Sequence, residues 1–250
     1  MRIVCAATVI LISLGTALGC GGDEDGASNG IETKPPEQIL ADMAEALRSV
    51  KTFHIEARER SPSRFTADVG LPDELRLEIR ERKVSGSLLV VHGSFFIKGN
   101  AAFWKQADAA RQADALAGRW LKVPYSFAKD LTKLVNAKNL SYCLAKEHGT
   151  LVRGGTATVG GQRAVIIIDK GDRAGTAPGK LYVAAVGKPL PLRLVATGRE
   201  RPRGRKDPRC SDEDNTPTRA GDEVIFSHYD EPLHLSPPPA AVTSGEETAR

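Results

Sequence analysis

The chain of 250 residues is 41% hydrophobic, and its 35 Lys and Arg against 31 Asp and Glu leave a formal net charge of +4. So small an excess in a chain of this length does not predict a nucleic-acid partner, and none is expected. Without an N-terminal export segment and a tether, roughly 200 residues remain, which is enough to bury one hydrophobic core.

Residues 1–19 have the pattern of a signal peptide. Arg2 is followed by an uncharged apolar run over residues 3–19 that ends in small residues. This run is shorter than the about twenty apolar residues that a membrane-spanning helix needs, and no other long apolar run follows it.

Cys20 directly follows the signal-like segment. The stretch Ala17-Leu18-Gly19-Cys20 resembles the lipobox of bacterial lipoproteins, with Ala17 at the place where Leu is commonest. This resemblance implies that the Cys20 thiol carries a diacylglyceryl group, and that acyl chains such as palmitate anchor the mature protein to the extracytoplasmic side of the cell membrane. The alternatives are an ordinary cleaved signal and an N-terminal membrane anchor with an incidental cysteine. Residues 20–34, rich in Gly and acid, are expected to form a flexible tether.

The remaining cysteines predict one disulfide. Cys5 leaves with the signal and Cys20 is assigned to the lipid, so Cys143 and Cys210 are left. In an exported chain such a pair is typical of a disulfide bond. The alternative is two separate thiols.

The first ordered element is expected to be a helix over Pro36–Val50. Proline suits a first helical turn, and an apolar stripe follows at helical spacing, formed by Ile39, Leu40, Met43, Leu47 and Val50. Strands are expected next, because apolar and polar residues alternate over 53–58 and 75–80. Further strand candidates between Gly, Pro and Asn turns are Val84–His92, Ser94–Lys98, Ala101–Gln106, Arg119–Val123, Leu151–Val159, Arg163–Asp169, Lys180–Val186, Leu192–Thr197 and Glu223–Tyr229.

Two helices interrupt the strands. One is expected over the alanine-rich Ala107–Ala117, which ends at Gly118, and a second is capped by Ser126, with an apolar face formed by Phe127, Leu131, Leu134 and Val135. Helices that do not alternate with strands favour an α+β fold, here a large curved antiparallel sheet, or half-open barrel, of about ten to eleven strands packed on about three helices. We expect one domain over residues 35–236, a polar excursion over Arg199–Gly221, and a disordered tail over 237–250.

Metal-site and phosphate-loop motifs are absent from the sequence. It has five histidines but no HExxH, no HxH and no paired Cys ligands, and it has no GxxxxGK[ST]. Glu147-His148 is either half of an acid–base pair or, as is commoner for such residues before a glycine, part of a hairpin turn. The glycine pairs 154–155 and 160–161 are better explained as hairpin turns than as a phosphate loop. The chain is therefore predicted not to be an enzyme, and neither cofactor nor metal is expected.

Three segments together resemble one family. PPEQILADMAEALRSVKTFHIEARE (35–59), GGTATVGGQRAVIIID (154–169) and DEVIFSHYDEPLHLSPPP (222–239) are similar to the opening, middle and closing elements of the LppX/LprG actinobacterial lipoproteins, which are related in fold to LolA and LolB. The resemblance implies a half-open sheet wrapped around helices, with an apolar cavity that takes acyl chains.

The leading hypothesis is a cell-envelope lipoprotein that binds or carries a lipid, lipoglycan or other hydrophobic ligand between sheet and helices. The apolar faces of Val84–Val91, Val165–Ile168 and Leu181–Val183 would then line either the core or a cavity. We expect a carrier to enclose at least about 300 Å³. The alternative is a surface-tethered sensor or scaffold on the same fold, which binds a protein partner without lipid cargo.

Overall fold

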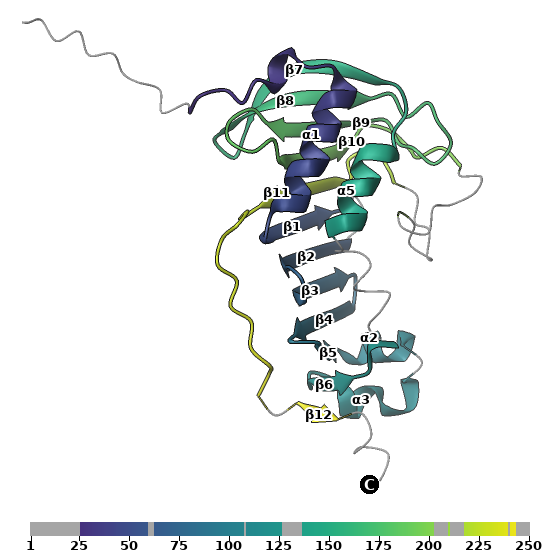
Figure 1. Ribbon diagram of the computed structural model, residues 1–250. Coiled ribbons are helices and arrows are strands. Elements are labelled where there is room, and N and C mark those ends of the chain that lie inside the picture. Colours follow the sequence, from purple (N-terminus) through teal and green to yellow (C-terminus); the bar gives the residue numbers. More distant parts are fainter. Residues whose placement is uncertain are drawn as a thin grey trace, which may run out of the picture.

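A single sheet runs through the whole molecule. The computed structural model describes residues 26–59, 63–107, 109–126, 137–202, 210, 218–239 and 241–243. Its strands lie in the order β12-β6-β5-β4-β3-β2-β1-β11-β10-β9-β8-β7 (Figure 1). All neighbours pair antiparallel except β12 with β6, which confirms the predicted α+β class and the large open antiparallel sheet.

The elements follow the sequence periodicity closely. The strands are β1 Thr52–Arg58, β2 Ser63–Gly70, β3 Glu74–Glu81, β4 Val84–Val91, β5 Ser94–Gly99, β6 Leu121–Val123, β7 Leu151–Val159, β8 Gln162–Asp169, β9 Gly179–Ala184, β10 Pro191–Ala196, β11 Glu223–Ser227 and β12 Val242–Thr243. The helices are α1 Pro36–Ser49, α2 Ala101–Gln106, α3 Ala113–Leu116 and α5 Ala137–Lys146, with 3-10 turns η1 Ile31–Thr33 and η2 Ala110–Gln112.

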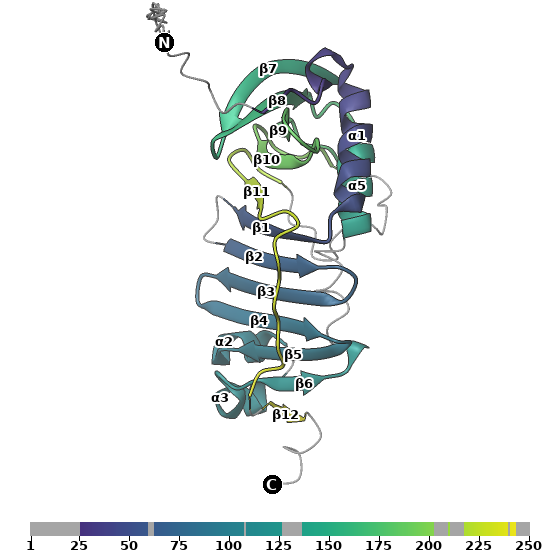
Figure 2. The same ribbon diagram turned by 60° about the vertical axis from the view of Figure 1, so that its left-hand side comes forward.

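Helix α1 lies against the β7–β10 end of the sheet. Its apolar stripe is buried as predicted, with Ile39, Met43 and Leu47 fully inside. Ile39, Leu40 and Met43 join the apolar side chains of β7, β8 and β9 in one cluster. The sheet curls around α1 and α5 at this end and is flatter over β1–β5 (Figure 2).

The concave face of β1–β6 is closed by packed side chains. Alternate residues such as Phe53, Leu77 and Leu88 share one cluster with Trp104 of α2 and with residues of α3. The sheet approaches α2 closely, because a Cβ on Gly99 would lie 2.2 Å from the Phe103 ring. This half of the molecule is a filled core.

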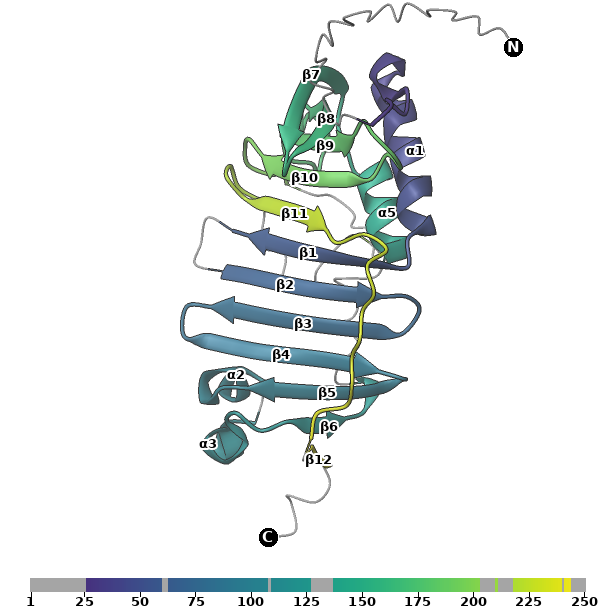
Figure 3. The same ribbon diagram turned by 90° about the vertical axis from the view of Figure 1, so that its left-hand side faces the viewer.

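The outer face of the sheet is crossed by the chain that follows β11 (Figure 3). Leu235 packs there against Leu89, Val91 and Phe96. The segment ends at β12, which pairs in parallel with β6. Val242 and Thr243 lie within the predicted tail, and their pairing with the edge strand satisfies backbone groups there.

Several predicted elements differ from the structure. Residues Ala101–Gln106 form helix α2 rather than a strand, because the Asn100 side chain caps the helix by accepting from the Phe103 N–H at 2.9 Å. The helix predicted over Ala107–Ala117 is confirmed only over 110–116, as η2 and α3. The face predicted for the second helix, over 127–135, lies outside the described residues.

Strand β2 and helix α5 were not predicted, although both have clear patterns. In β2, Phe65, Ala67 and Val69 alternate with polar residues.

In the part of the chain that the structure describes, no helix has the length and apolar character that a bilayer crossing requires.

Candidate ligand pocket

An apolar pocket of about 240 Å³ lies between the helices and the curled end of the sheet. One helix wall comes from α5, which packs against α1. The residues that line the pocket are Leu40, Leu140, Cys143, Leu144, Glu147, His148, Leu151, Ile167, Asp169, Gly175, Thr176, Ala177, Gly179, Leu181, Leu194, Ala196, Glu200, Cys210 and Thr218. Sequence reasoning did not find α5 and therefore missed its two leucines.

The floor of the pocket is one row of side chains across the sheet. Ile167 of β8 pairs with Leu181 of β9, and Leu181 pairs with Leu194 of β10. Directly paired residues lie on the same face of a sheet, so these three side chains all point toward the helices. The row makes the floor apolar over three strands.

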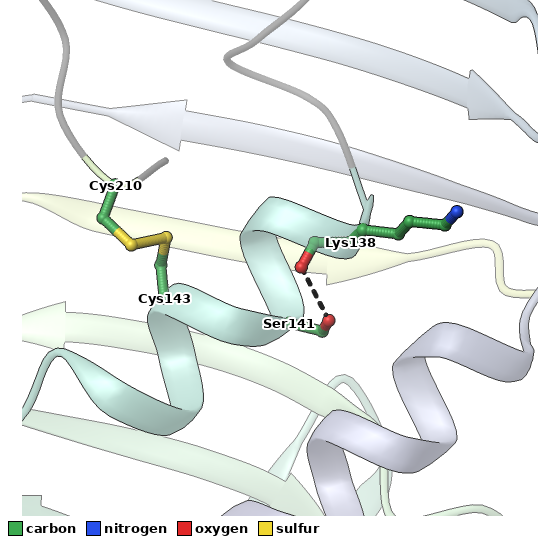
Figure 4. The surroundings of a disulfide bond; sticks show 4 residues. All are labelled: Lys138, Ser141, Cys143 and Cys210. Carbon is green, nitrogen blue, oxygen red and sulfur yellow. Dashed lines mark hydrogen bonds between the residues drawn. A yellow bond between two sulfur atoms is a disulfide. The ribbon is translucent and has the colours of Figure 1, made fainter. Parts of the chain in front are cut away.

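A disulfide bond forms part of the wall. Cys143 of α5 is bonded to Cys210, with their Cα atoms 5.5 Å apart (Figure 4). Cys210 belongs to the predicted excursion between β10 and β11, whose base is fixed where the Glu200 N–H donates to the Thr218 carbonyl at 2.9 Å. In α5, the buried Ser141 hydroxyl donates to the Lys138 carbonyl at 3.0 Å, so it needs no partner from the pocket. The predicted disulfide is thus seen in the structure.

The polar side chains at the rim of the pocket contact backbone groups of neighbouring loops. Asp169 Oδ1 accepts from the Gly149 N–H at 3.0 Å and from the Gly171 N–H at 2.7 Å. His148 Nδ1 lies 2.8 Å from the Gly149 carbonyl oxygen. Nearby, the Thr150 N–H donates to Asp172 at 2.6 Å, and hydrogen bonding with Thr150 holds the pKa of Asp172 below its usual range. These contacts order the loops at the mouth of the pocket.

Glu147 and His148 do not form a hairpin turn, because they lie in the link between α5 and β7. The glycine pair 160–161 forms the β7–β8 turn, with positive φ at both residues, as predicted. The pair 154–155 instead lies at an irregularity within β7, where the register shifts between Arg153 and Thr156. That part of the prediction is wrong.

The predicted lining residues divide between pocket and core. Ile167 and Leu181 reach the pocket, whereas Leu88, Val165 and Val183 are buried in packed clusters. The volume of about 240 Å³ is below the expected 300 Å³. Cys20 lies outside the described residues, and within those residues no group of three or more His, Cys, Asp or Glu could hold a metal ion.

Comparisons with known proteins identify the fold. LprF from Mycobacterium bovis matches with a TM-score of 0.53 and 15% sequence identity, over 85% of this chain and 99% of that protein. The lipoprotein LppX of Mycobacterium tuberculosis matches with a TM-score of 0.47 and 13% identity, over 80% of this chain and 98% of LppX. No protein-family model and no curated protein sequence matches. The predicted resemblance is confirmed for the fold: this chain has the LppX/LprG type of fold found in LprF.

Proposed function

We propose that this protein is a lipoprotein of the cell envelope that binds or carries a lipid or another hydrophobic molecule between its sheet and its helices. The observation that carries the proposal is the apolar pocket enclosed by α1, α5 and β7–β10. A lipid chain leaves a membrane only for another apolar space, where each buried CH₂ recovers about 0.8 kcal/mol. The fold shared with LprF is consistent with this role.

The volume of the pocket limits the ligand. About 240 Å³ is below the range of ordinary ligand pockets, which begins at about 300 Å³. The space suits one short acyl chain of a lipid, or the end of a longer chain.

Anchoring through Cys20 belongs to the same proposal. The described chain begins at Gly26, and Ser28 forms a bridge with Val186 just beyond β9. The six residues from Cys20 to Gly26 span at most about 20 Å. A diacylglyceryl group on Cys20 would therefore hold the pocket end of the molecule close to the membrane.

The small volume also favours a second candidate function. A surface-tethered sensor or scaffold needs no cargo space, and the β1–β6 half of the concave face is a filled core around residues such as Trp104. Such a protein would bind a protein partner instead of a lipid.

Solvent extraction followed by mass spectrometry distinguishes the two. The full chain with Cys20→Ser is purified without detergent and its extract is analysed. We expect about one apolar ligand for each chain. Ala177→Phe, which places a ring in the pocket, should remove the ligand, whereas Ala41→Phe on the exposed face of α1 should not. A chain that yields no ligand, or an Ala177→Phe variant that retains it, would favour the sensor or scaffold.

A further inference from the structure

A second and larger hollow lies on the outer face of the sheet, at the strand ends near α2. Its volume is about 590 Å³. We call it the basic hollow; it is lined by Glu78, Ile79, Arg80, Arg82, Lys83, Val84, Ser85, Gly86, Ser87, Lys98, Gly99, Asn100, Ala117 and Gly118. The basic hollow shares no lining residue with the apolar pocket, and other strands and helices form it.

The outer face of β4 explains where this hollow opens. Its outward residues are polar at the start of the strand, with Ser85 and Ser87, and apolar at the end, with Leu89 and Val91. The chain after β11 covers the apolar part through Leu235. It crosses the opposite ends of the strands and leaves the polar part open (Figure 3).

The charge of the basic hollow is strongly unbalanced. Four cationic side chains line it, from Arg80, Arg82, Lys83 and Lys98, against the single carboxylate of Glu78. The ion pairs of the described residues include none of these four cations.

Several arginines elsewhere on the same sheet are paired. Arg76 Nη1 lies 3.7 Å from Asp68 Oδ2, and Arg58 Nε lies 3.0 Å from Glu56 Oε1. Arg64 also pairs with Glu56. These arginines of β1, β2 and β3 are thus ion-paired, whereas the four cations that line the basic hollow are in none of the ion pairs of the described residues.

Strand register places serine hydroxyls beside the charged side chains. Ser87 of β4 lies between its partners Glu78 of β3 and Lys98 of β5 on one row, and Ser85 pairs with Arg80 on the next row. Adjacent strands are about 4.8 Å apart, so hydroxyl and cationic groups share one small area. Lys98 Nζ is held over the Trp120 ring at 4.8 Å from its centroid.

The turn that carries Arg82 and Lys83 is fixed in place. The Asn100 side chain donates to the Lys83 carbonyl at 2.6 Å and accepts from the Ser85 N–H at 3.3 Å. The same side chain caps α2 through the Phe103 N–H at 2.9 Å. Asn100 thus connects the β3–β4 turn to α2. These hydrogen bonds order the backbone of the basic hollow in the absence of a ligand.

We propose that the basic hollow binds a ligand that carries several phosphate groups. Three net positive charges over about 590 Å³ match an anion with more than one charged group. Arginine binds phosphate through two parallel hydrogen bonds, and serine hydroxyls supply further donors to its three terminal oxygens. The phosphates of a free oligophosphate and those of an envelope polymer offer this same chemistry.

Titration with inorganic triphosphate tests the proposal. The full-length chain, purified in a neutral detergent, is titrated at low ionic strength while tryptophan fluorescence is recorded, since Trp120 contacts Lys98. Arg82→Gln with Lys83→Gln should weaken binding about tenfold. The matched control, Lys170→Gln with Lys180→Gln, removes the same charge from exposed positions elsewhere and should leave affinity within about twofold of wild type.

Each further outcome decides the proposal. Failure of wild type to bind, or equal weakening in the control, overturns it. If Arg82→Gln with Lys83→Gln does not fold, Arg80→Gln alone should still weaken binding. Citrate should bind more weakly than triphosphate, and equal binding overturns the assignment to phosphate. Binding of the Cys20→Ser chain, purified without detergent, to phosphatidylglycerol vesicles that triphosphate does not displace would make the surface a membrane contact and also overturn it.

Discussion

Asp230 connects three parts of the chain at one residue. Its Oδ1 accepts from the Lys51 N–H at 2.7 Å, its Oδ2 accepts from Lys188 Nζ at 2.8 Å, and its own N–H donates to the Thr52 carbonyl at 2.9 Å. The hydrogen bond from Lys188, followed by the one from the Lys51 backbone, holds the pKa of Asp230 below its ordinary value of 3.8. Asp230 also has φ of 57°, which Asn tolerates well.

Asp230→Asn removes the charge of this residue with little change in its size, and therefore tests what the charge contributes to stability. A carboxyl whose pKa is lower in the folded state stabilises the fold above its unfolded pKa, and this contribution is lost as pH falls through the folded pKa. We expect the variant to be less stable than wild type at pH 7 by under about 1 kcal/mol, because the pair is partly exposed. The difference should begin to shrink as pH falls past the ordinary value of 3.8 and should vanish below the lowered pKa of the folded state. Urea unfolding at both pH values measures it, and a difference that persists in acid would show that the charge is not responsible.

The disulfide acts on the unfolded chain. Cys143 and Cys210 are separated by 67 residues, so their bond shortens a long loop in the unfolded state. Replacing both by serine should lower the free energy of unfolding by about 2–4 kcal/mol, measured by urea unfolding. Wild type reduced by a dithiol is the control and should lose a similar amount. A loss well under 1 kcal/mol in both would contradict this loop argument.

At the scale of elements, the contact of α2 with the sheet requires glycine. A Cβ on Gly99 would lie 2.2 Å from the Phe103 ring, and one on Gly86 would lie 2.7 Å from it. Side chains at these positions would force α2 away from β4 and β5. The basic hollow depends on the same contact, because Asn100 joins α2 to the β3–β4 turn.

Gly99→Ala should therefore destabilise the protein by about 1–3 kcal/mol through overpacking. In the background of Phe103→Ala the same change should cost less, because the ring is gone and only the Cβ of residue 103, at 2.9 Å, still lies close. The four proteins of this double-mutant cycle are compared by urea unfolding. Equal costs in both backgrounds would show that the ring is not the cause.

Helices and strands were predictable where apolar residues of one continuous segment fall on one face at helical or strand spacing. The stripe from Ile39 to Leu47 identified α1, and alternation identified most strands. Ala101–Gln106 was misassigned because small and aromatic residues fit a strand as well as a helix, and the cap that decides is a side-chain bond from Asn100. Strand β2 was missed although its alternation was visible.

At the scale of the whole molecule, the apolar pocket and the basic hollow lie in different halves. The pocket belongs to the β7–β10 end, from which the described chain begins, and the basic hollow belongs to the β3–β5 half. These two groups of strands lie at different places along the sheet (Figure 2). A protein held through Cys20 would thus present its apolar pocket near the membrane and its cationic surface farther out.

Cys20→Ser tests the lipid anchor on which this orientation depends. If acyl chains on Cys20 hold the protein, the variant should leave the membrane fraction, because two chains anchor firmly and none remains. The measurement is fractionation of cells followed by detection of the protein, with Cys5→Ser as the matched control that should stay bound. A Cys20→Ser protein that remains in membranes, or an unacylated wild type, would refute the anchor.

The sequence by itself determined the fold class, helix α1 and most strands, because periodicity is a property of the chain. It left a bond between Cys143 and Cys210 as one of two alternatives, and the tertiary structure decided for the bond. The sequence did not determine the apolar pocket or the basic hollow. Leu144 and Leu194 meet only because the sheet curls, and Arg80 and Lys98 share a surface only through strand register. Such contacts join residues far apart in sequence, so only the tertiary structure decides them.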